Sequence, residues 1–182
     1  FSAIWDYEDQ HYKIYRVSNM RNARDRKTMD TDTGFDPITG LPTYVVETAE
    51  IATFDQIVTS LNSDPTNPDN LIVTCGNYGN DNFIYMTKTA TTAEDLSNEF
   101  MPIQGNLPQA PVFETLFSWN TNKKALVDTE YGVYSTKDIF AASPSWSSEN
   151  QKGMEILPVF ELRQQQFENN AEWGIENHGT VY

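Results

Sequence analysis

Two acidic residues, Asp128 and Glu130, have a spacing that could support acid–base chemistry. They lie two positions apart in the stretch ALVDTEYGV. In an extended strand such residues point to the same face, about 7 Å apart. Glycoside hydrolases use two carboxyl groups about 5–10 Å apart across the scissile bond. The spacing therefore allows a glycosidase site, although acidic pairs are also common on the surfaces of soluble proteins.

An arginine clamp for a sugar carboxylate is the second chemistry to weigh. Sialidase-type sites need several arginines, from different parts of the fold, that bind one carboxylate bidentately. The chain has five arginines, and four of them lie close together near its start: Arg16, Arg21, Arg24, Arg26 and Arg163. This distribution does not predict a clamp built from these residues alone.

Metal and thiol chemistry receive little support. The segment DTDTGFD (Asp30–Asp36) has alternating carboxylates like the start of a calcium loop, but it lacks the later bidentate glutamate. His11 and His178 have no partner at metal-ligand spacing. The single cysteine, Cys75, excludes an intrachain disulfide and a thiolate zinc site. We therefore predict a solvated loop at Asp30–Asp36, a buried Cys75, and no catalytic, cofactor-binding or metal-binding residue.

Four aromatic residues in polar stretches are the candidate ligand contacts: Tyr7, Tyr12, Tyr78 and Trp173. Exposed aromatic rings stack on sugars or anchor protein partners, because they offer a large apolar area with a polar tip. The alternative is that some of them pack over the edges of sheets.

Bulk composition limits the partners. The chain of 182 residues is 38% hydrophobic with a formal net charge of −14. That content is typical of a globular protein with a core. A strongly acidic surface repels phosphate backbones and anionic lipids, so nucleic acid is not an expected partner. The sequence contains no apolar run long enough to span a bilayer.

The elements that must position these residues recur along the chain. Asn70–Thr87 reads as two short apolar strands joined by a Gly/Asn/Asp turn, and Lys124–Thr136 reads as a second copy. Pro111-Val112-Phe113 recurs as Pro158-Val159-Phe160, a step of 158 − 111 = 47 residues. Short strands of this composition predict an all-β fold. A unit of about 40–50 residues is the length of a four-stranded propeller blade.

The repeat predicts two complete and two partial blades: 1–49, with a loop insertion at 20–42, then 50–108, 109–156 and 157–182. The expected strands and hairpins are Ala3–Trp5, Lys13–Val17, Tyr44–Thr48, Ile57–Leu61, Leu71–Thr74, Phe83–Thr87, Phe100–Gln104, Val112–Trp119, Ala125–Thr136, Ser145–Ser148, Leu157–Gln165 and Thr180–Tyr182. A propeller ring needs about four to eight blades. We therefore expect a longer polypeptide or a partner chain to supply the rest, and the insertion to be the most mobile region.

Three stretches resemble the BNR (Asp-box) repeats of sialidase- and sortilin-type β-propellers: Asp64–Thr87, Leu126–Asp138, and the recurring NLP…PVF and LPVFELRQQ. The last is similar to propellers of large secreted or cell-surface proteins of bacteria with type IX secretion and gliding machinery. Thr136-Lys137-Asp138 fits the start of an Asp box, but Ile139-Phe140 replaces its glycine step. In the first copy, Thr87-Lys88-Thr89 lacks the aspartate.

The resemblance implies a secreted or cell-surface protein in which this propeller segment serves as a non-enzymatic platform for a protein or glycan ligand. Its other partners would be the remaining blades. One alternative is part of a glycan-active propeller enzyme, a glycoside hydrolase whose site lies mostly outside these residues. Another is a structural spacer without a ligand.

Overall fold

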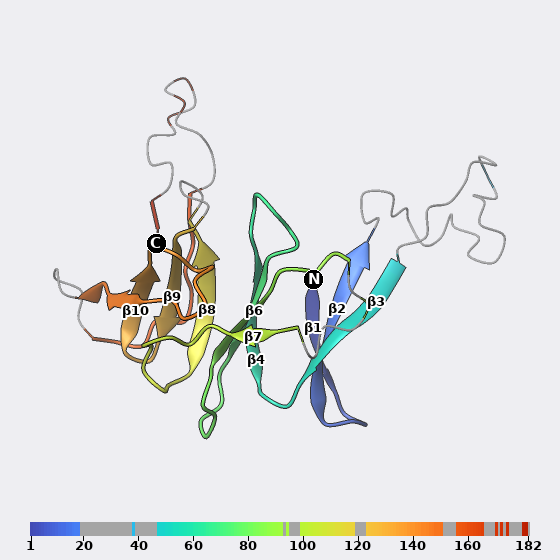
Figure 1. Ribbon diagram of the computed structural model, residues 1–182. Helices are drawn as coiled ribbons and strands as arrows, with labels where there is room; N and C mark the ends of the chain where they lie inside the picture. The colour runs from blue at the N-terminus through green and yellow to red at the C-terminus, as the bar shows by residue number, and fades with distance from the viewer. Residues whose placement is uncertain are drawn as a thin grey trace.

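The computed structural model describes residues 1–18, 38, 47–92, 94, 99–118, 123–150, 156–165, 170, 172, 174 and 180–181. Within these residues the chain forms eleven β-strands and no α-helix. The strands make three antiparallel sheets that lie side by side, and no sheet closes on itself (Figure 1). The prediction of an all-β fold is confirmed. None of the segments described is a helix long and apolar enough to cross a membrane.

Each sheet is a meander in which strands that follow one another in the chain pair with one another. The first sheet contains β1 (Ser2–Asp6), β2 (His11–Ser18) and β3 (Glu47–Phe54). The second contains β4 (Val58–Ser63), β5 (Leu71–Cys75), β6 (Ile84–Thr87) and β7 (Met101–Pro102). The third contains β8 (Val112–Phe117), β9 (Ala125–Thr129), β10 (Gly132–Thr136) and β11 (Trp146–Ser148).

The second and third sheets repeat the same strand register. Val58 pairs with Cys75 in one and Val112 with Thr129 in the other, and both steps are 54 residues (112 − 58 and 129 − 75). Each pairing then shifts at the next position, which places a β-bulge at the same point of both sheets. A bulge sharpens the local twist of its strand. The two sheets therefore share pairing and irregularity as well as sequence.

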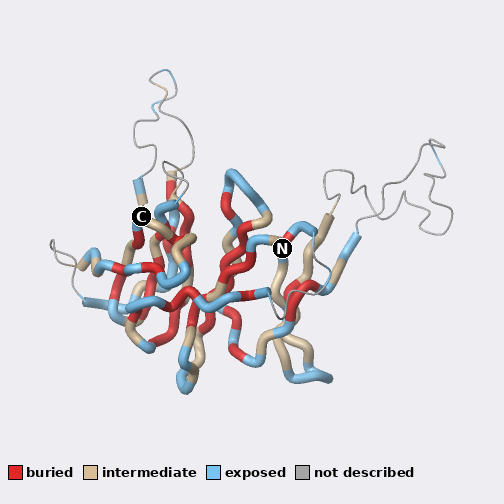
Figure 2. The backbone as a smooth tube through the Cα atoms, in the orientation of Figure 1, coloured by how far each residue is buried: buried red, intermediate tan, exposed pale blue. Residues whose placement is uncertain are grey.

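The sheets pack through alternate residues of their central strands. On β5, Leu71 and Val73 pack toward the first sheet, whereas Ile72 packs toward the third. The period-2 alternation of a strand produces this arrangement, because successive side chains leave opposite faces. All five residues of β5 are buried, as expected for a strand covered on both faces. Figure 2 shows buried backbone running through the middle of the molecule.

The segment Leu157–Gln165 does not form the predicted strand. Among the described residues its only regular pairing is a single bridge between Gln164 and Val181. A strand needs a continuous ladder for its backbone groups, and one bridge does not make a ladder. The segment lies instead on the outer face of the third sheet, where Leu162 packs on Leu116 and Val133. The backbone N–H of Val159 donates to the carbonyl of Thr129 over 3.2 Å.

The last strand of the first sheet also differs from the prediction. The sequence favours Tyr44–Thr48, but β3 runs from Glu47 to Phe54. Its buried residues, Ile51 and Ala52, lie in a stretch rich in Ala, Thr and Glu that has a weak strand signal. The predicted loop insertion at 20–42 falls outside the described residues, except for Ile38.

Candidate binding surface

The acidic pair Asp128 and Glu130 is not brought together. Asp128 lies in β9 and is fully buried, and its Oδ1 accepts a hydrogen bond from the backbone N–H of Glu114. Glu130 begins the turn after β9, and its carboxylate accepts a hydrogen bond from the Tyr78 hydroxyl. Because β9 ends before Glu130, the strand alternation that would place both side chains on one face does not reach Glu130. The two carboxyl groups therefore have different partners.

The four aromatic candidates have different roles. Tyr7 lies in the β1–β2 turn and is 82% exposed, and Tyr78 lies in the loop between β5 and β6 and is 59% exposed. Tyr12 stacks on Trp5 with ring centroids 5.1 Å apart and packs against the core between the first two sheets. Tyr12 is therefore a packing residue. Trp173 lies outside the described residues.

The sequence reasoning missed a third exposed tyrosine. Tyr131 lies in the two-residue turn between β9 and β10 and is 47% exposed. Its signal was available in the repeat, because this turn corresponds to the loop that carries Tyr78. The three hairpin turns that carry Tyr7, Tyr78 and Tyr131 lie at the lower end of the sheets in Figure 1. We call these turns, together with the exposed Ile57 beside the Tyr78 loop, the hairpin face.

The turns of the hairpin face are held by local hydrogen bonds. Asp6 Oδ1 accepts from the backbone N–H groups of Glu8 (2.8 Å) and Asp9 (3.2 Å), which fixes the turn around Tyr7. The backbone N–H of Tyr131 donates to Thr129 Oγ1 over 3.0 Å. Side chains on pinned turns lose less conformational entropy on binding. The tyrosines are therefore presented on a preorganised surface.

Carboxylates dominate the charge of this surface. Its exposed or half-exposed acidic residues are Glu8, Asp9, Asp81 and Glu130, and the exposed Asp55 lies beside it, two residues before Ile57. Lys13 is neutralised, since its Nζ lies 2.8 Å from Asp6 and 2.6 Å from Asp9. The hydrogen bond from Lys13 lowers the pKa of Asp6 to about 2, and His11 Nδ1 lies 2.8 Å from Asp55. The ammonium group of Lys13 is therefore already paired with carboxylates.

One contact joins the second and third sheets across the hairpin face. The hydroxyl of Tyr78 donates to Glu130, and this bond raises the pKa of Tyr78 to about 12. The two residues are far apart in the sequence, so the contact sets the position of one turn relative to the next. Tyr78 keeps most of its ring exposed while its hydroxyl is engaged.

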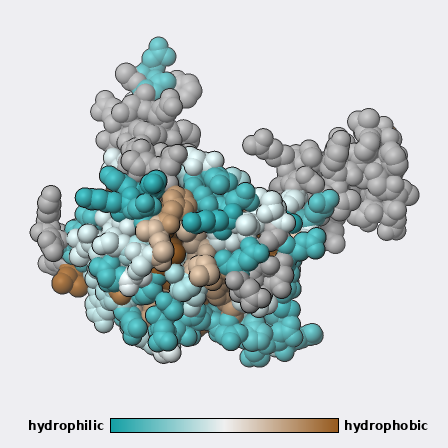
Figure 3. All heavy atoms as spheres, viewed as in Figure 1, coloured by the Kyte–Doolittle hydropathy of each residue, from teal (hydrophilic) through white to brown (hydrophobic). Residues whose placement is uncertain are grey.

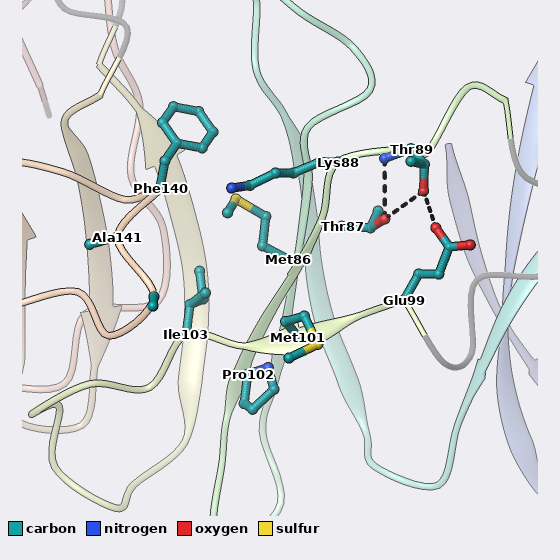
Figure 4. Close-up of a pocket in the computed structure, with 11 residues that line it drawn as sticks. Met86, Thr87, Lys88, Thr89, Glu99, Met101, Pro102, Ile103, Phe140 and Ala141 are labelled. Carbon is teal, nitrogen blue, oxygen red and sulfur yellow. Dashed lines mark hydrogen bonds between the residues drawn. The ribbon is translucent and has the colours of Figure 1, made fainter.

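A groove of about 380 Å³ forms a second candidate (Figure 4). Its lining includes Met86, Met101, Ile103 and Phe140, and Figure 3 shows an apolar stripe running between the second and third sheets. Lys88 Nζ lies 5.5 Å from the centroid of the Phe140 ring. The neighbouring edge strand β7 contains Pro102, which has no N–H to offer an added strand. Addition of a peptide strand along this edge is therefore disfavoured.

The predicted metal and thiol features can be followed in the parts of the chain that the structure describes. These parts contain no group of three or more His, Cys, Asp or Glu side chains that could hold a metal ion. Cys75 is buried, as predicted, and burial raises the pKa of its thiol to about 12. The thiolate nucleophile is therefore disfavoured at neutral pH. His178 and Asp30–Asp36 lie outside the described residues.

Comparison with models of known protein families, with curated proteins and with solved structures found no match.

Proposed function

We propose that these residues belong to a β-propeller of the Asp-box type that acts as a non-enzymatic binding platform. The support is the repetition of four-stranded meanders with one register and one bulge position. The first strands of neighbouring sheets also meet, since Thr59 Oγ1 of β4 donates to the carbonyl of Val112 of β8 over 2.6 Å. Further sheets, from the same polypeptide or another chain, would complete the ring, and a secreted or cell-surface location follows from the resemblance.

The hairpin face is the proposed binding surface. The observation that carries this proposal is the presence of exposed tyrosines on three successive hairpin turns at one end of the sheets. Tyrosines of this kind are frequent anchors in protein interfaces. Because the surrounding charge is negative, a polypeptide segment with exposed Lys or Arg side chains fits best. Such side chains pair with carboxylates and stack on aromatic rings.

The alternative of a glycoside hydrolase has less support. Such an enzyme needs two carboxyl groups that both reach the substrate. Asp128 is fully buried, and Glu130 is engaged by Tyr78. A neutral glycan stacked on the exposed tyrosines is the remaining alternative ligand. The glycan array described next distinguishes it from a basic polypeptide.

The test is selection from a phage-displayed random peptide library, with a glycan array probed in parallel. The variant carries Tyr7→Ser, Tyr78→Ser and Tyr131→Ser together, and the control carries Ile4→Ser and Ile156→Ser, which are exposed elsewhere. We expect Lys- and Arg-rich peptides that bind the natural protein and the control but bind the triple variant at least about tenfold more weakly. Peptides that bind all three proteins equally, or binding to neutral glycans alone, would overturn the proposal.

A further inference from the structure

The buried carboxyl group of Asp128 is incompletely partnered. Asp128 is 0% exposed, and its Oδ1 accepts the N–H of Glu114. Its Oδ2 is buried without a hydrogen-bond partner among the described residues. A buried ionised carboxylate with an unsatisfied oxygen is strongly unfavourable. The site therefore favours the neutral acid.

A second carboxyl group lies directly across the sheet. Glu114 on β8 is the register partner of Asp128 on β9, so the two side chains emerge on one face. Glu114 Oε2 accepts a hydrogen bond from the backbone N–H of Leu162 over 3.0 Å. Like charges opposite each other on neighbouring strands repel. The pair is thus a cross-strand acid cluster that also holds the segment 157–165.

The second sheet shows that the fold does not need these carboxyl groups. The residues 54 positions earlier (114 − 54 and 128 − 54) are Ser60 and Thr74, which pair in the same way. Thr74 Oγ1 lies 2.9 Å from Thr59 Oγ1 and is satisfied as a neutral group. Two hydroxyl groups in one sheet thus correspond to two carboxyl groups in the next. Of these two sheets, the third is the one that carries ionisable carboxyl groups at this pair of positions.

The segment above the pair is loosely seated. A cavity of about 470 Å³ lies between the third sheet and the segment, lined in part by Leu126, Val133, Val159 and Leu162. This space is open to solvent on one side, so part of the segment lacks the dense packing that is normal in protein interiors. The hydrogen bond from Leu162 to Glu114 is thus one of a few contacts that hold the segment, together with the Val159–Thr129 hydrogen bond and the packing of Phe160 on Phe113.

We propose that Glu114 and Asp128 form a pH-sensitive latch that holds residues 157–165 on the outer face of the third sheet in acid and loosens them toward neutral pH. The other charged groups nearby cannot replace this effect. Glu161 and Arg163 of the segment pair with each other at 2.5 Å. Lys124 and Glu149 are exposed at the cavity, and Glu130 is engaged by Tyr78. Val133, opposite Asp128 on β10, carries no charge.

The direction follows from proton linkage. Burial is the main cause that raises the pKa of Asp128 to about 7, and the Glu114 charge adds to it. When the segment lifts, water reaches Asp128 and its pKa falls toward about 4. The closed state therefore holds a proton that the open state releases. Opening becomes about tenfold more favourable per pH unit between roughly pH 4.5 and 6.5, and levels off above about pH 7.5.

Hydrogen–deuterium exchange tests the latch. Protection factors of the 157–165 amides, corrected for intrinsic exchange, are measured from pH 4.5 to 8.5 in the natural protein and in Asp128→Asn. Asp55→Asn, at an exposed carboxylate, is the matched control. We expect protection to fall by about 100-fold between pH 4.5 and 6.5 in the natural protein and the control, and by less than about threefold in Asp128→Asn.

The amides of β5 in the second sheet report whether each variant is folded. If the β5 amides are not protected in Asp128→Asn, that variant is unfolded and Asp128→Thr is used in its place. The threonine copies the residue found at the equivalent position of the second sheet. A flat pH profile of segment protection in the natural protein would overturn the proposal, as would the same fall in the neutral variant.

Discussion

Asn106 makes the clearest single link between the outer ends of the second and third sheets. Its Nδ2 donates to the carbonyl of Trp146 over 2.9 Å, and its Oδ1 accepts the backbone N–H of Trp146 at 2.6 Å. The amide side chain thus pairs with the backbone of β11 as a neighbouring strand would. We predict that Asn106→Ala destabilises the protein, because both groups of Trp146 lose their partner.

The magnitude follows from two hydrogen bonds. Each contributes about 1 kcal/mol net, and a buried donor or acceptor left unsatisfied costs about 1–3 kcal/mol. Trp146 is only 4% exposed, but Asn106 is exposed and both bonds are only partly buried, so water replaces part of what the amide supplies. We expect a loss of about 2–3 kcal/mol in the free energy of unfolding. For a chain of this size, that corresponds to a fall of roughly 5–10 °C in Tm.

The assay is urea denaturation followed by tryptophan fluorescence, with Gln109→Ala, an exposed position in the same connection, as the control. Asn106→Asp keeps the acceptor for the Trp146 N–H but loses the donor, so we expect an intermediate loss of about 1 kcal/mol. A change below about 0.5 kcal/mol in Asn106→Ala would show that this contact does not couple the sheets.

Three further predictions test local features. Gly105→Ala should lower the free energy of unfolding by more than about 2 kcal/mol in the same denaturation assay. The reason is that φ of Gly105 is +53° and a Cβ would lie 1.9 Å from the carbonyl oxygen of Pro144. An unchanged free energy of unfolding would contradict this close approach. The Cys75 thiol, whose pKa burial raises to about 12, should react with a disulfide reagent only on unfolding, and rapid labelling of the native protein would refute its burial. Lys13 lowers the pKa of Asp6 from 3.8 to about 2, so this pair stabilises the fold above about pH 4 and the effect is lost as pH falls toward 2. The stability of Lys13→Met, measured by unfolding curves over this pH range, should lack this component of acid sensitivity. An unchanged dependence of stability on pH would exclude a contribution from the pair.

Most strands were predictable because local rules and tertiary packing agree in them. The hairpins of the second and third sheets combine β-branched runs with Gly, Asn and Asp turns, and both form where the pattern places them. The segment Leu157–Gln165 has the same local pattern, but in the described part of the chain it pairs with another segment at a single bridge. Local pattern fixes strand propensity, whereas pairing depends on which other segment is present.

The candidate surface was predictable only in part. Tyr7 and Tyr78 could be placed in exposed turns because polar turn residues surround them, and the structure exposes both. Tyr12 has similar neighbours in the sequence, yet it stacks on Trp5. The engagement of Glu130 by Tyr78 joins residues 52 positions apart. A cross-sheet contact of this kind depends on how the sheets stack, which spacing within one strand does not reveal.

The most direct test of the proposed platform is an experimental structure of the natural polypeptide that contains these residues. We predict that a fourth sheet, with four strands, covers the outer face of the third beyond residues 157–165, and that its hairpin turn continues the hairpin face beyond Tyr131. A helical layer on that face, or an outer face left open with no further sheet in the polypeptide or its partners, would contradict the proposal.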